Sequence, residues 1–469
     1  MSTVIKYIRL FILGGVSMKT IAAISTALGN GGIGIVRMSG EDCFEILNKI
    51  FKPKNSSEIK PYSIKYGHIY EGDNIIDEVI VSYFIKPKSY TAENMCEINS
   101  HGSNIVLNKI LQLCLKNGAV LAEPGEFTKK AFLNGRIDLS QAESVIDIIN
   151  SKSEKERQAS VNQLEGFLSK EIKRIKNDIL TILTDIEASI DYPEYDIEEV
   201  TNNKARFVLN NVKDSLCRLE ESFENGKIIK NGIKTAIIGT PNVGKSSLLN
   251  AILKEDRAIV SKYEGTTRDS IEEDISVNGV PIRIVDTAGI RNTDNEIEKI
   301  GIKKSKNIAD SADLIIAIFD ASRKLSKDDY DIINIIKDKK AIILINKKDI
   351  KDKKIEKDKL KELNKPIVEI SALNKEGIND LYTEITNLFK LNEININNEI
   401  VITNIRHLDL IRRAKENAIN AINTIDANMP IDIISINIKD IIDCLNSITG
   451  ENTSEDIIND IFSKFCLGK

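Results

Sequence analysis

The sequence lacks an excess of basic residues: 65 Lys and Arg stand against 70 Asp and Glu, which gives a formal net charge of -5. Proteins that hold nucleic acid through their overall charge are basic, so any RNA binding by this chain must come from a local patch. The six cysteines include no C-x-x-C pair, and the three histidines have no metal-ligand spacing. Neither a zinc site nor a disulfide framework is therefore indicated, and the composition fits the reducing cytoplasm.

Long apolar runs are also missing. The one stretch that could mislead, residues 7–16, is apolar around Arg9 and is shorter than the roughly 20 residues that span a bilayer. It has no convincing small-residue cleavage site, so a signal peptide or organelle address is the less favoured interpretation. Met18 stands just before a strand-like run at 20–27, and we interpret residues 1–17 as a dispensable or misassigned leader.

What the chain does have is the composition of an ordinary globular protein, with 42% hydrophobic and 29% charged residues. At roughly 150 residues per domain, a length of 469 suffices for about three domains. Residues 18–135 mix β-rich and helical runs, which predicts an N-terminal α+β domain. Residues 136–230 and 387–469 are helical in pattern, and residues 231–386 between them are not. The predicted architecture is a helical domain interrupted by an inserted α/β domain.

Apolar residues at helical spacing characterise the predicted helical domain. They recur at intervals of three and four residues in two stretches that flank the break Asp191-Tyr192-Pro193. Long amphipathic helices of this kind need partners against which to bury the apolar face. The residues are Ile172, Ile175, Ile179, Ile182 and Ile186 before the break and Leu209, Val212, Leu216, Leu219 and Phe223 after it.

The inserted segment has a different pattern, in which short apolar runs alternate with helical ones. The runs are nearly continuous in Ile, Val and Leu, which is typical of a mostly parallel sheet covered by helices on both faces. The predicted strands are residues 235–238, 282–285, 314–319, 341–345 and 366–370.

The strongest motif follows the first of these strands. The string Gly239-Thr240-Pro241-Asn242-Val243-Gly244-Lys245-Ser246 fits G-x-x-x-x-G-K-S/T and precedes a helical run. Glycines let backbone N–H groups wrap a phosphate chain, Lys245 can reach the β- and γ-phosphates, and the Ser246 hydroxyl can coordinate Mg²⁺. The segment therefore predicts a nucleotide-binding loop.

Further GTPase elements follow. Asp286-Thr287-Ala288-Gly289 ends a strand, where a carboxylate can hold Mg²⁺ through water and a glycine N–H can meet the γ-phosphate. Asn346-Lys347-Lys348-Asp349 follows another strand, and its Asp can accept from the guanine ring N–H and amino group, which favours guanine over adenine. Ser371-Ala372 can offer a backbone N–H to the guanine carbonyl. Within Gly265-Thr266-Thr267-Arg268-Asp269, the Thr267 hydroxyl can complete the Mg²⁺ shell as part of a switch loop.

One departure concerns the attacking water. Ile290 stands where many regulatory GTPases carry a glutamine that orients this water. Glu298, in an acidic segment downstream, is a candidate replacement, and the alternative is that the segment is a solvated acidic loop. Arg268 could lend positive charge in the transition state, although arginines in such loops are often surface residues.

With these motifs, the chain from about residue 18 to residue 469 resembles the tRNA-modifying GTPases of the MnmE family, also called TrmE. The specific marks lie outside the GTPase segment. They are Gly31-Gly32-Ile33-Gly34-Ile35-Val36-Arg37, Glu123-Pro124-Gly125-Glu126-Phe127-Thr128, Ala131-Phe132-Leu133-Asn134-Gly135-Arg136-Ile137-Asp138-Leu139 and the closing Cys466-Leu467-Gly468-Lys469. The family usually closes with Cys-Ile-Gly-Lys, so Leu467 is a mild departure.

The resemblance implies an N-terminal domain that dimerises and binds a formyl-tetrahydrofolate, a helical domain and an inserted GTPase domain. It implies a homodimer that works with an MnmG-type FAD protein, as a heterotetramer, on the wobble uridine of certain tRNAs. The product is an aminomethyl or carboxymethylaminomethyl group at carbon 5. The implied folate contacts are Arg37, Glu97, Arg136 and Lys469, whose charges suit the carboxylates and the pterin of a folate, although each residue by itself reads as a surface or structural charge.

The resemblance also implies that potassium activates GTP hydrolysis and that the GTPase domains pair across their switch faces. A monovalent cation near the phosphates can take the electrostatic role that an arginine finger plays elsewhere. The matching potassium positions are Asn242, Ser261, Tyr263 and Thr266, and Glu298 falls where the family has the carboxylate that orients the water. Cys466 matches the family's tail cysteine, either as a thiol near the modification chemistry or as a small residue that packs the tail.

The motifs and the resemblance together predict a GTP site in which Lys245 and Glu298 are catalytic. Two function classes remain: an enzyme of tRNA modification, which we prefer, and a regulatory or ribosome-assembly GTPase without modification chemistry. Binding of formyl-tetrahydrofolate distinguishes them. The predicted GTP-binding residues are Asn242, Val243, Gly244, Lys245, Ser246, Ser247, Ser261, Thr266, Thr267, Asp286, Thr287, Ala288, Gly289, Asn346, Lys347, Asp349, Ser371 and Ala372.

Overall fold

The structure, a computed structural model, describes residues 19–27, 29–55, 58–191, 198–253, 273–285, 309–394, 396 and 399–469. The leader interpreted at residues 1–17 lies outside these ranges. The chain divides into two compact units. The first contains Met1–Ile149, Gln163–Leu216 and Asp409–Lys469, and the second contains Asn150–Asn162 and Cys217–Leu408.

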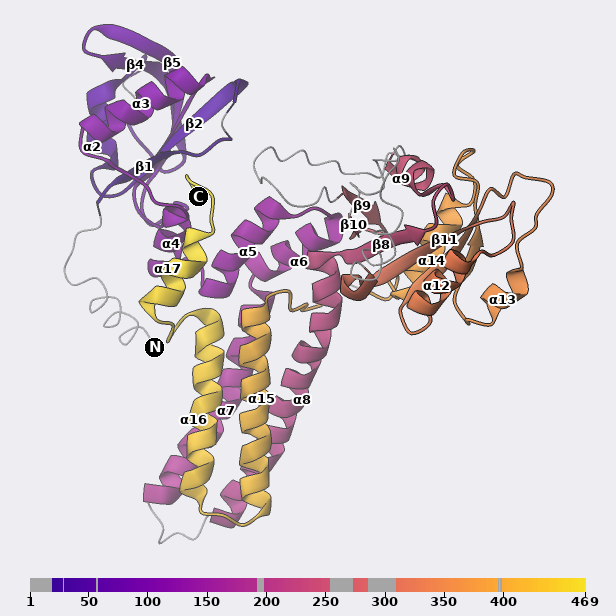
Figure 1. The fold of residues 1–469 in the computed structure, drawn as a ribbon. Helices are drawn as coiled ribbons and strands as arrows, with labels where there is room; N and C mark the ends of the chain where they lie inside the picture. The colour runs from indigo at the N-terminus through magenta and orange to yellow at the C-terminus, as the bar shows by residue number, and fades with distance from the viewer. Residues whose placement is uncertain are drawn as a thin grey trace. The chain divides into compact units, whose positions relative to one another are not determined.

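The first unit begins with a seven-stranded sheet in the order β3-β4-β5-β6-β2-β1-β7 (Figure 1). Neighbouring strands are antiparallel, except that β1 and β7 are parallel. Helices α2 (Cys43–Ile50) and α3 (Asn104–Lys116) pack on the sheet and share one apolar core with it, as expected of an α+β domain. The strands are β1 (Ile21–Ile24), β2 (Gly31–Ser39), β3 (Phe51–Pro53), β4 (Ser63–Glu71), β5 (Asn74–Phe84), β6 (Met95–Gly102) and β7 (Val120–Leu121).

The order of these strands brings two charged residues together. Strands β2 and β6 are sequence-distant but adjacent, and their register sets Arg37 directly opposite Glu97. Directly opposed residues of an antiparallel pair share one face of the sheet, so their side chains can meet.

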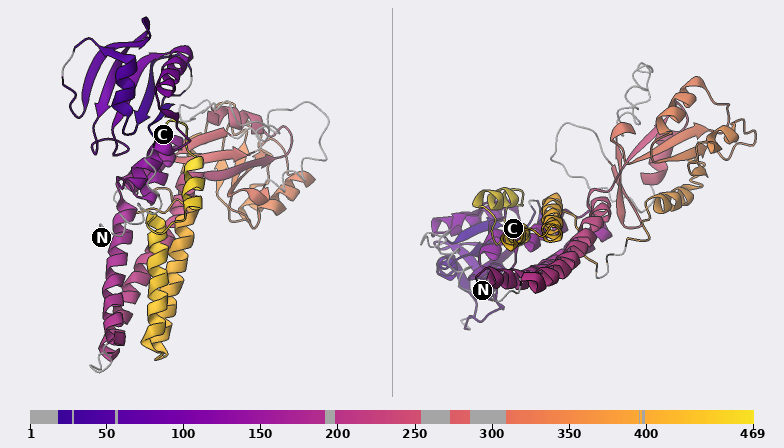
Figure 2. Two further views of the ribbon diagram at one scale, coloured as in Figure 1. Left: turned by 90° about the vertical axis from the view of Figure 1, so that its left-hand side faces the viewer. Right: turned by 90° about the horizontal axis from the view of Figure 1, so that it is seen from below.

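The remaining helices of this unit include a group of long helices that run side by side (Figures 1 and 2). Ion pairs join α7 to α8 through Lys204 and Asp185, at 2.5 Å, and α8 to α15 through Arg206 and Asp426, at 2.7 Å. The helices that lie wholly or mostly in this unit are α4 (Glu126–Leu133), α5 (Leu139–Asn150), α7 (Phe167–Asp191), α8 (Glu198–Asn231), α15 (Ile405–Asp426), α16 (Ile431–Thr449) and α17 (Glu455–Ser463). From Cys217 onward α8 belongs to the second unit, as does most of α6 (Glu154–Leu164).

The predicted apolar stripes are the buried faces of α7 and α8. All five isoleucines of the first stripe are buried along α7. In the second stripe, Leu209, Val212, Leu216 and Leu219 are buried in α8, whereas Phe223 is only partly buried. The period of 3.6 residues therefore identified both helices and the side on which each packs.

The second unit contains a six-stranded sheet in the order β13-β12-β11-β8-β10-β9. Its strands are parallel except for the edge strand β9, which pairs antiparallel with β10. The mostly parallel sheet is the one predicted, with β9 as an added hairpin partner. The strands are β8 (Ile233–Gly239), β9 (Glu273–Val277), β10 (Val280–Val285), β11 (Leu314–Asp320), β12 (Ala341–Asn346) and β13 (Ile367–Glu369).

Helices cover both faces of this sheet. Alternate residues of β11 belong to two different apolar clusters, because successive side chains of a strand point to opposite faces. One cluster includes α9 (Lys245–Leu253) and α14 (Ile378–Leu388), and the other includes α12 (Lys327–Ile336) and α13 (Lys357–Lys361). The chain is therefore an α+β domain, a helical part and an α/β domain with a mostly parallel sheet.

Of the helices that the structure describes, none combines the length and the apolar character that a bilayer crossing requires.

Candidate functional site

The loop between β8 and α9 has the backbone of a phosphate-binding loop. Asn242 and Gly244 have φ values of +63° and +100°. A Cβ atom at Gly244 would collide with the side-chain amide of Asn346, so glycine is required there. Lys245, Ser246 and Ser247 form the first turn of α9, whose N–H groups and dipole favour an anion at this end.

Lys245 turns back onto its own loop. Its ammonium donates to the carbonyl oxygens of Gly239 at 2.8 Å and Thr240 at 3.0 Å. Burial lowers the pKa of Lys245, because the charged form loses contact with water. A triphosphate in the loop would place negative charge beside this partly desolvated ammonium.

Asn346 connects three of the predicted nucleotide-binding segments. Its amide nitrogen donates to the carbonyl oxygen of Val243 in the phosphate loop, at 2.7 Å. Its amide oxygen accepts from the backbone N–H of Ala372 at 3.0 Å. Of the two backbone N–H groups in the segment predicted to meet a guanine carbonyl, that of Ala372 is directed at Asn346 and that of Ser371 at the carbonyl oxygen of Glu376. The Asn346 side chain thus holds the three segments in register.

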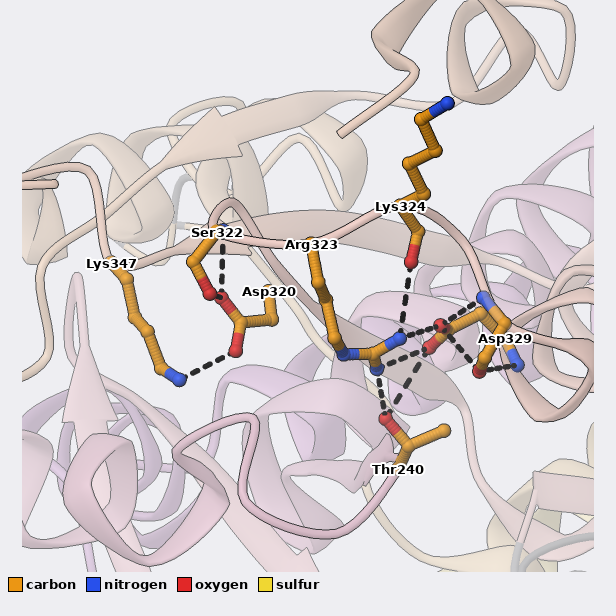
Figure 3. A network of polar contacts seen from close by, with 8 residues as sticks. Thr240, Asp320, Ser322, Arg323, Lys324, Asp329 and Lys347 are labelled. Carbon is orange, nitrogen blue, oxygen red and sulfur yellow. Dashed lines mark hydrogen bonds and ion pairs between the residues drawn. The ribbon is translucent and has the colours of Figure 1, made fainter. Parts of the chain in front are cut away.

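Two other residues of the segment predicted to read guanine, Lys347 and Asp349, also have polar partners. Lys347 has a φ of +66° and its ammonium lies 2.5 Å from the carboxylate of Asp320, at the end of β11 (Figure 3). Burial alone would raise the pKa of Asp320, but hydrogen bonds from Lys347 and Ser322 outweigh burial and lower it. A hydrogen bond from Ser371 lowers the pKa of Asp349, which keeps that carboxylate an acceptor.

A third set of contacts, not anticipated from the sequence, reaches the phosphate loop from Arg323, before α12, and Asp329, in its first turn (Figure 3). Arg323 donates to the Thr240 hydroxyl at 2.7 Å and to the Asp329 carboxylate at 2.6 Å. Asp329 also forms a capping box with Ser326, the N-cap of α12. The S-x-x-D spacing could have revealed this cap, but nothing local links Arg323 to a threonine 83 positions away.

Several predicted site residues lie outside the described residues. For Mg²⁺ only Ser246, and for potassium only Asn242, belongs to the part of the chain that the structure describes. Among described residues, no group of three or more His, Cys, Asp or Glu side chains could hold a metal ion. The residues outside are Ser261, Tyr263, Thr266, Thr267, Arg268, Asp286, Thr287, Ala288, Gly289 and Glu298.

The predicted folate residues come together in the first unit. Arg37 and Glu97 form a largely buried ion pair with a 2.7 Å separation. The guanidinium groups of Arg37 and Arg136 both approach the ring of Tyr90, at 5.7 and 4.6 Å from its centroid. Tyr90 was not anticipated, because nothing in the sequence near it marks it as lying between two arginines.

The end of the chain reaches the same cluster. The Gly468 carbonyl oxygen accepts from Arg37 at 3.2 Å and from the Ser25 hydroxyl at 3.0 Å. Burial, and after it the charge of Arg37, lowers the pKa of Lys469. Arg37 and Arg136 thus lie at Tyr90, Glu97 pairs with Arg37, and Lys469 is close enough to Arg37 and Glu97 for their charges to affect its pKa. This set of three cations and one carboxylate fits a ligand that carries both carboxylates and a polar heterocycle.

Cys466 lies beside this cluster with an exposed side chain. Its backbone oxygen accepts from the N–H of Gly125, at 3.4 Å, within the Glu123-Pro124-Gly125 turn. The residue therefore anchors the tail through its backbone, and both roles considered for Cys466, a thiol near the modification chemistry or a small residue that packs the tail, stay predictions.

Two family models match the chain. The model described as the GTP-binding protein TrmE N-terminus matches residues 20–136, and the model described as the MnmE helical domain matches residues 139–466. The second match encloses the α/β domain, as expected of a helical domain interrupted by an insert.

Curated relatives match over nearly the whole chain. Three proteins named tRNA modification GTPase MnmE, from Acetivibrio thermocellus, Clostridioides difficile and Lactobacillus delbrueckii subsp. bulgaricus, are 50%, 47% and 46% identical to it. Each match covers 96% of this chain and 98% or 99% of the relative. These names do not favour the regulatory or ribosome-assembly alternative. Since the N-terminal model, the helical model and the full-length relatives agree with the geometry, the chain belongs to the MnmE family of tRNA modification GTPases.

Proposed function

We propose that this chain is a GTP hydrolase whose cycle serves the modification of tRNA. The observation that carries the proposal is the Asn346 side chain, which ties the phosphate loop at Val243 to the guanine-reading segments at Ala372. A site that combines a phosphate cradle with an ionised Asp349 suits guanine nucleotides, because the carboxylate accepts from two donors that adenine lacks. Membership of the family supports tRNA as the substrate.

The hydrolytic step follows from the residue types in the site. Lys245 would bind the β- and γ-phosphates, and the hydroxyls of Ser246 and Thr267 would hold Mg²⁺ against them. Asn242 is proposed to hold potassium together with Ser261, Tyr263 and Thr266, since amide and hydroxyl oxygens suit a hard cation. Glu298 would orient the attacking water in place of the glutamine that Ile290 replaces. Potassium would add positive charge where negative charge develops in the transition state.

We further propose that the cluster around Tyr90 binds a formyl-tetrahydrofolate. Arg37, Arg136 and Lys469 would bind its carboxylates, and Glu97 would accept from its pterin. The bound folate would supply a one-carbon unit for carbon 5 of the wobble uridine. A homodimer of the chain is proposed to act with an MnmG-type FAD protein in this chemistry.

Complementation tests the function directly. A bacterial strain that lacks its own copy of this gene is supplied with this chain, and its tRNA nucleosides are analysed by mass spectrometry. We expect a modified wobble uridine with the wild type, none with Lys245→Ala, and wild-type levels with the matched control Lys359→Ala, whose ammonium binds Tyr330 on the surface. An unmodified wobble uridine beside folded wild-type protein would refute the assignment.

Steady-state hydrolysis tests the catalytic roles. Turnover is compared in potassium and sodium salts, and we expect a marked increase in potassium. Glu298→Ala should lower turnover while GTP affinity stays at the wild-type value, because the carboxylate acts on water and not on the nucleotide. Equal rates in the two salts would contradict the potassium role.

A further inference from the structure

The hydroxyl of Thr240 contacts Arg323, in the turn before α12, and Asp329, in the first turn of α12 (Figure 3). It accepts from the Arg323 guanidinium at 2.7 Å and is directed at the Asp329 carboxylate at 3.3 Å. A hydroxyl offers one donor and two acceptor positions, so both kinds of function are used here. Thr240 is buried and the side chain of Asp329 is 2% exposed, whereas that of Arg323 is 36% exposed, so Arg323 reaches from the surface to two buried partners.

Asp329 has enough partners without Thr240. Its carboxylate accepts from the Ser326 backbone N–H at 2.8 Å, from the Ser326 hydroxyl at 2.7 Å and from Arg323. Burial alone would raise the pKa of Asp329, but the hydrogen bonds from Arg323 and Ser326 outweigh it, and the group stays ionised. The start of α12 is thus capped without Thr240. The Arg323 nitrogen that donates to Thr240 also donates to Asp329 at 3.2 Å, so one guanidinium links the start of α12 to the phosphate loop.

The contact restrains the phosphate loop at Thr240. The Thr240 hydroxyl is held from α12, and the Thr240 carbonyl oxygen accepts from Lys245 at 3.0 Å. The next two residues are Pro241 and Asn242, which lie in the part of the motif that wraps the phosphates. Restraint on Thr240 therefore restrains the loop where it meets the nucleotide.

We propose that Arg323 and Asp329 are positioning residues for the nucleotide site, which act through the Thr240 hydroxyl to hold the phosphate loop in its binding conformation. The inference rests on the proposed binding of guanine nucleotides. It assigns to the turn before α12 a role in nucleotide retention that the sequence motifs do not contain. A loop already held in place loses less conformational freedom when it binds phosphate, so the nucleotide dissociates more slowly.

The test measures release of mant-GDP from the full-length protein by stopped-flow fluorescence, in buffer with Mg²⁺ and potassium. A dissociation rate is independent of the fraction of folded protein, so a loss of stability alone does not change it. Thr240→Val removes the hydroxyl and keeps the shape, whereas Thr240→Ser keeps the hydroxyl. Lys359→Ala is the control, because it breaks a 2.7 Å contact with Tyr330 of α12 that does not involve Thr240.

We expect release at least about tenfold faster in Thr240→Val, as loss of one charge-assisted hydrogen bond predicts, and a return toward the wild-type rate in Thr240→Ser. Arg323→Ala should accelerate release similarly, and the double variant should be no faster than either single variant, because both remove the same link. Wild-type release from Thr240→Val, or effects that multiply in the double variant, would overturn the inference. A wild type that binds no mant-GDP would instead overturn the proposed function.

Discussion

The docking of the chain's last residues depends on a backbone that only glycine adopts easily. Gly468 has a φ of +83°. A Cβ atom there would lie 2.9 Å from the Cα of Ser25 and closer still to the carbonyl oxygen of Ile24, and both belong to backbone that cannot move aside cheaply. Gly468→Ala should therefore release the tail, and with it Lys469, from the cluster around Tyr90.

The cost can be built from the contacts that are lost. The left-handed backbone costs a residue with a Cβ about 1–2 kcal/mol. Loss of the bond from Arg37 to the Gly468 carbonyl costs about 1.5–3 kcal/mol, and loss of the bond from Ser25 costs about 0.5–1.5 kcal/mol. A docked alanine carries the strain and an undocked tail loses the two bonds, so these costs are alternatives and are not summed. An undocked tail removes Lys469 from the folate, and loss of that charge-assisted contact, about 1.5–3 kcal/mol, should lower the affinity for formyl-tetrahydrofolate by roughly 10- to 150-fold.

Isothermal titration calorimetry with 5-formyl-tetrahydrofolate measures this loss, and hydrogen exchange of the C-terminal peptide reports whether the tail has undocked. Leu467→Ala is the matched control, because its side chain is 50% exposed and its backbone is unconstrained by a positive φ. It should bind folate within about twofold of the wild type. If Gly468→Ala binds folate as tightly as Leu467→Ala does, the tail does not form part of the pocket and the reasoning is wrong.

Three further predictions concern stability and protonation. Ile182→Ala in α7 should lower the free energy of unfolding by about 2–5 kcal/mol in urea denaturation, because the side chain is 1% exposed, whereas Leu180→Ala, 39% exposed on the same helix, should cost less than about 1 kcal/mol; equal losses would contradict the assigned face. Folate affinity should fall as pH rises through the lowered pKa of Lys469, hence below the ordinary lysine value of about 10.4, because the anion binds the protonated form. In calorimetry across that pH range, Lys469→Arg should show no such fall, and identical profiles would refute the assignment. The hydrogen bond from His101 to Asp77 raises the pKa of His101, so its NMR titration should move down toward about 6.5 in Asp77→Asn, and an unchanged midpoint would exclude this pairing.

The parts of the nucleotide site that could be predicted from sequence are those whose chemistry is local. Gly244 needs its positive φ, and Lys245 and Ser246 follow it directly, so one contiguous string carries the whole phosphate loop. The stripe of isoleucines in α7 is local in the same sense, since a helix places residues three and four apart on one face. The predicted folate contacts, Arg37, Glu97, Arg136 and Lys469, form no local pattern in the sequence. They were predicted only from the resemblance to the family.

The side-chain contacts that join these segments link residues that are far apart in sequence and close in the folded protein. Asn346 contacts Val243 because β12 and β8 lie on either side of β11 in one sheet. The three strands are parallel, so the loops that follow them lie at the same edge of the sheet. Arg323 reaches Thr240 for the same reason, and Tyr90 lies between Arg37 and Arg136 only after the domain has folded.

By itself, the sequence determined which segments become helices, strands and phosphate loop, because periodicity and backbone preference act between near neighbours. The tertiary structure alone decided which side chains hold those segments in register. Hydrogen bonds and ion pairs between residues far apart in the chain depend on strand order, and no local pattern encodes it.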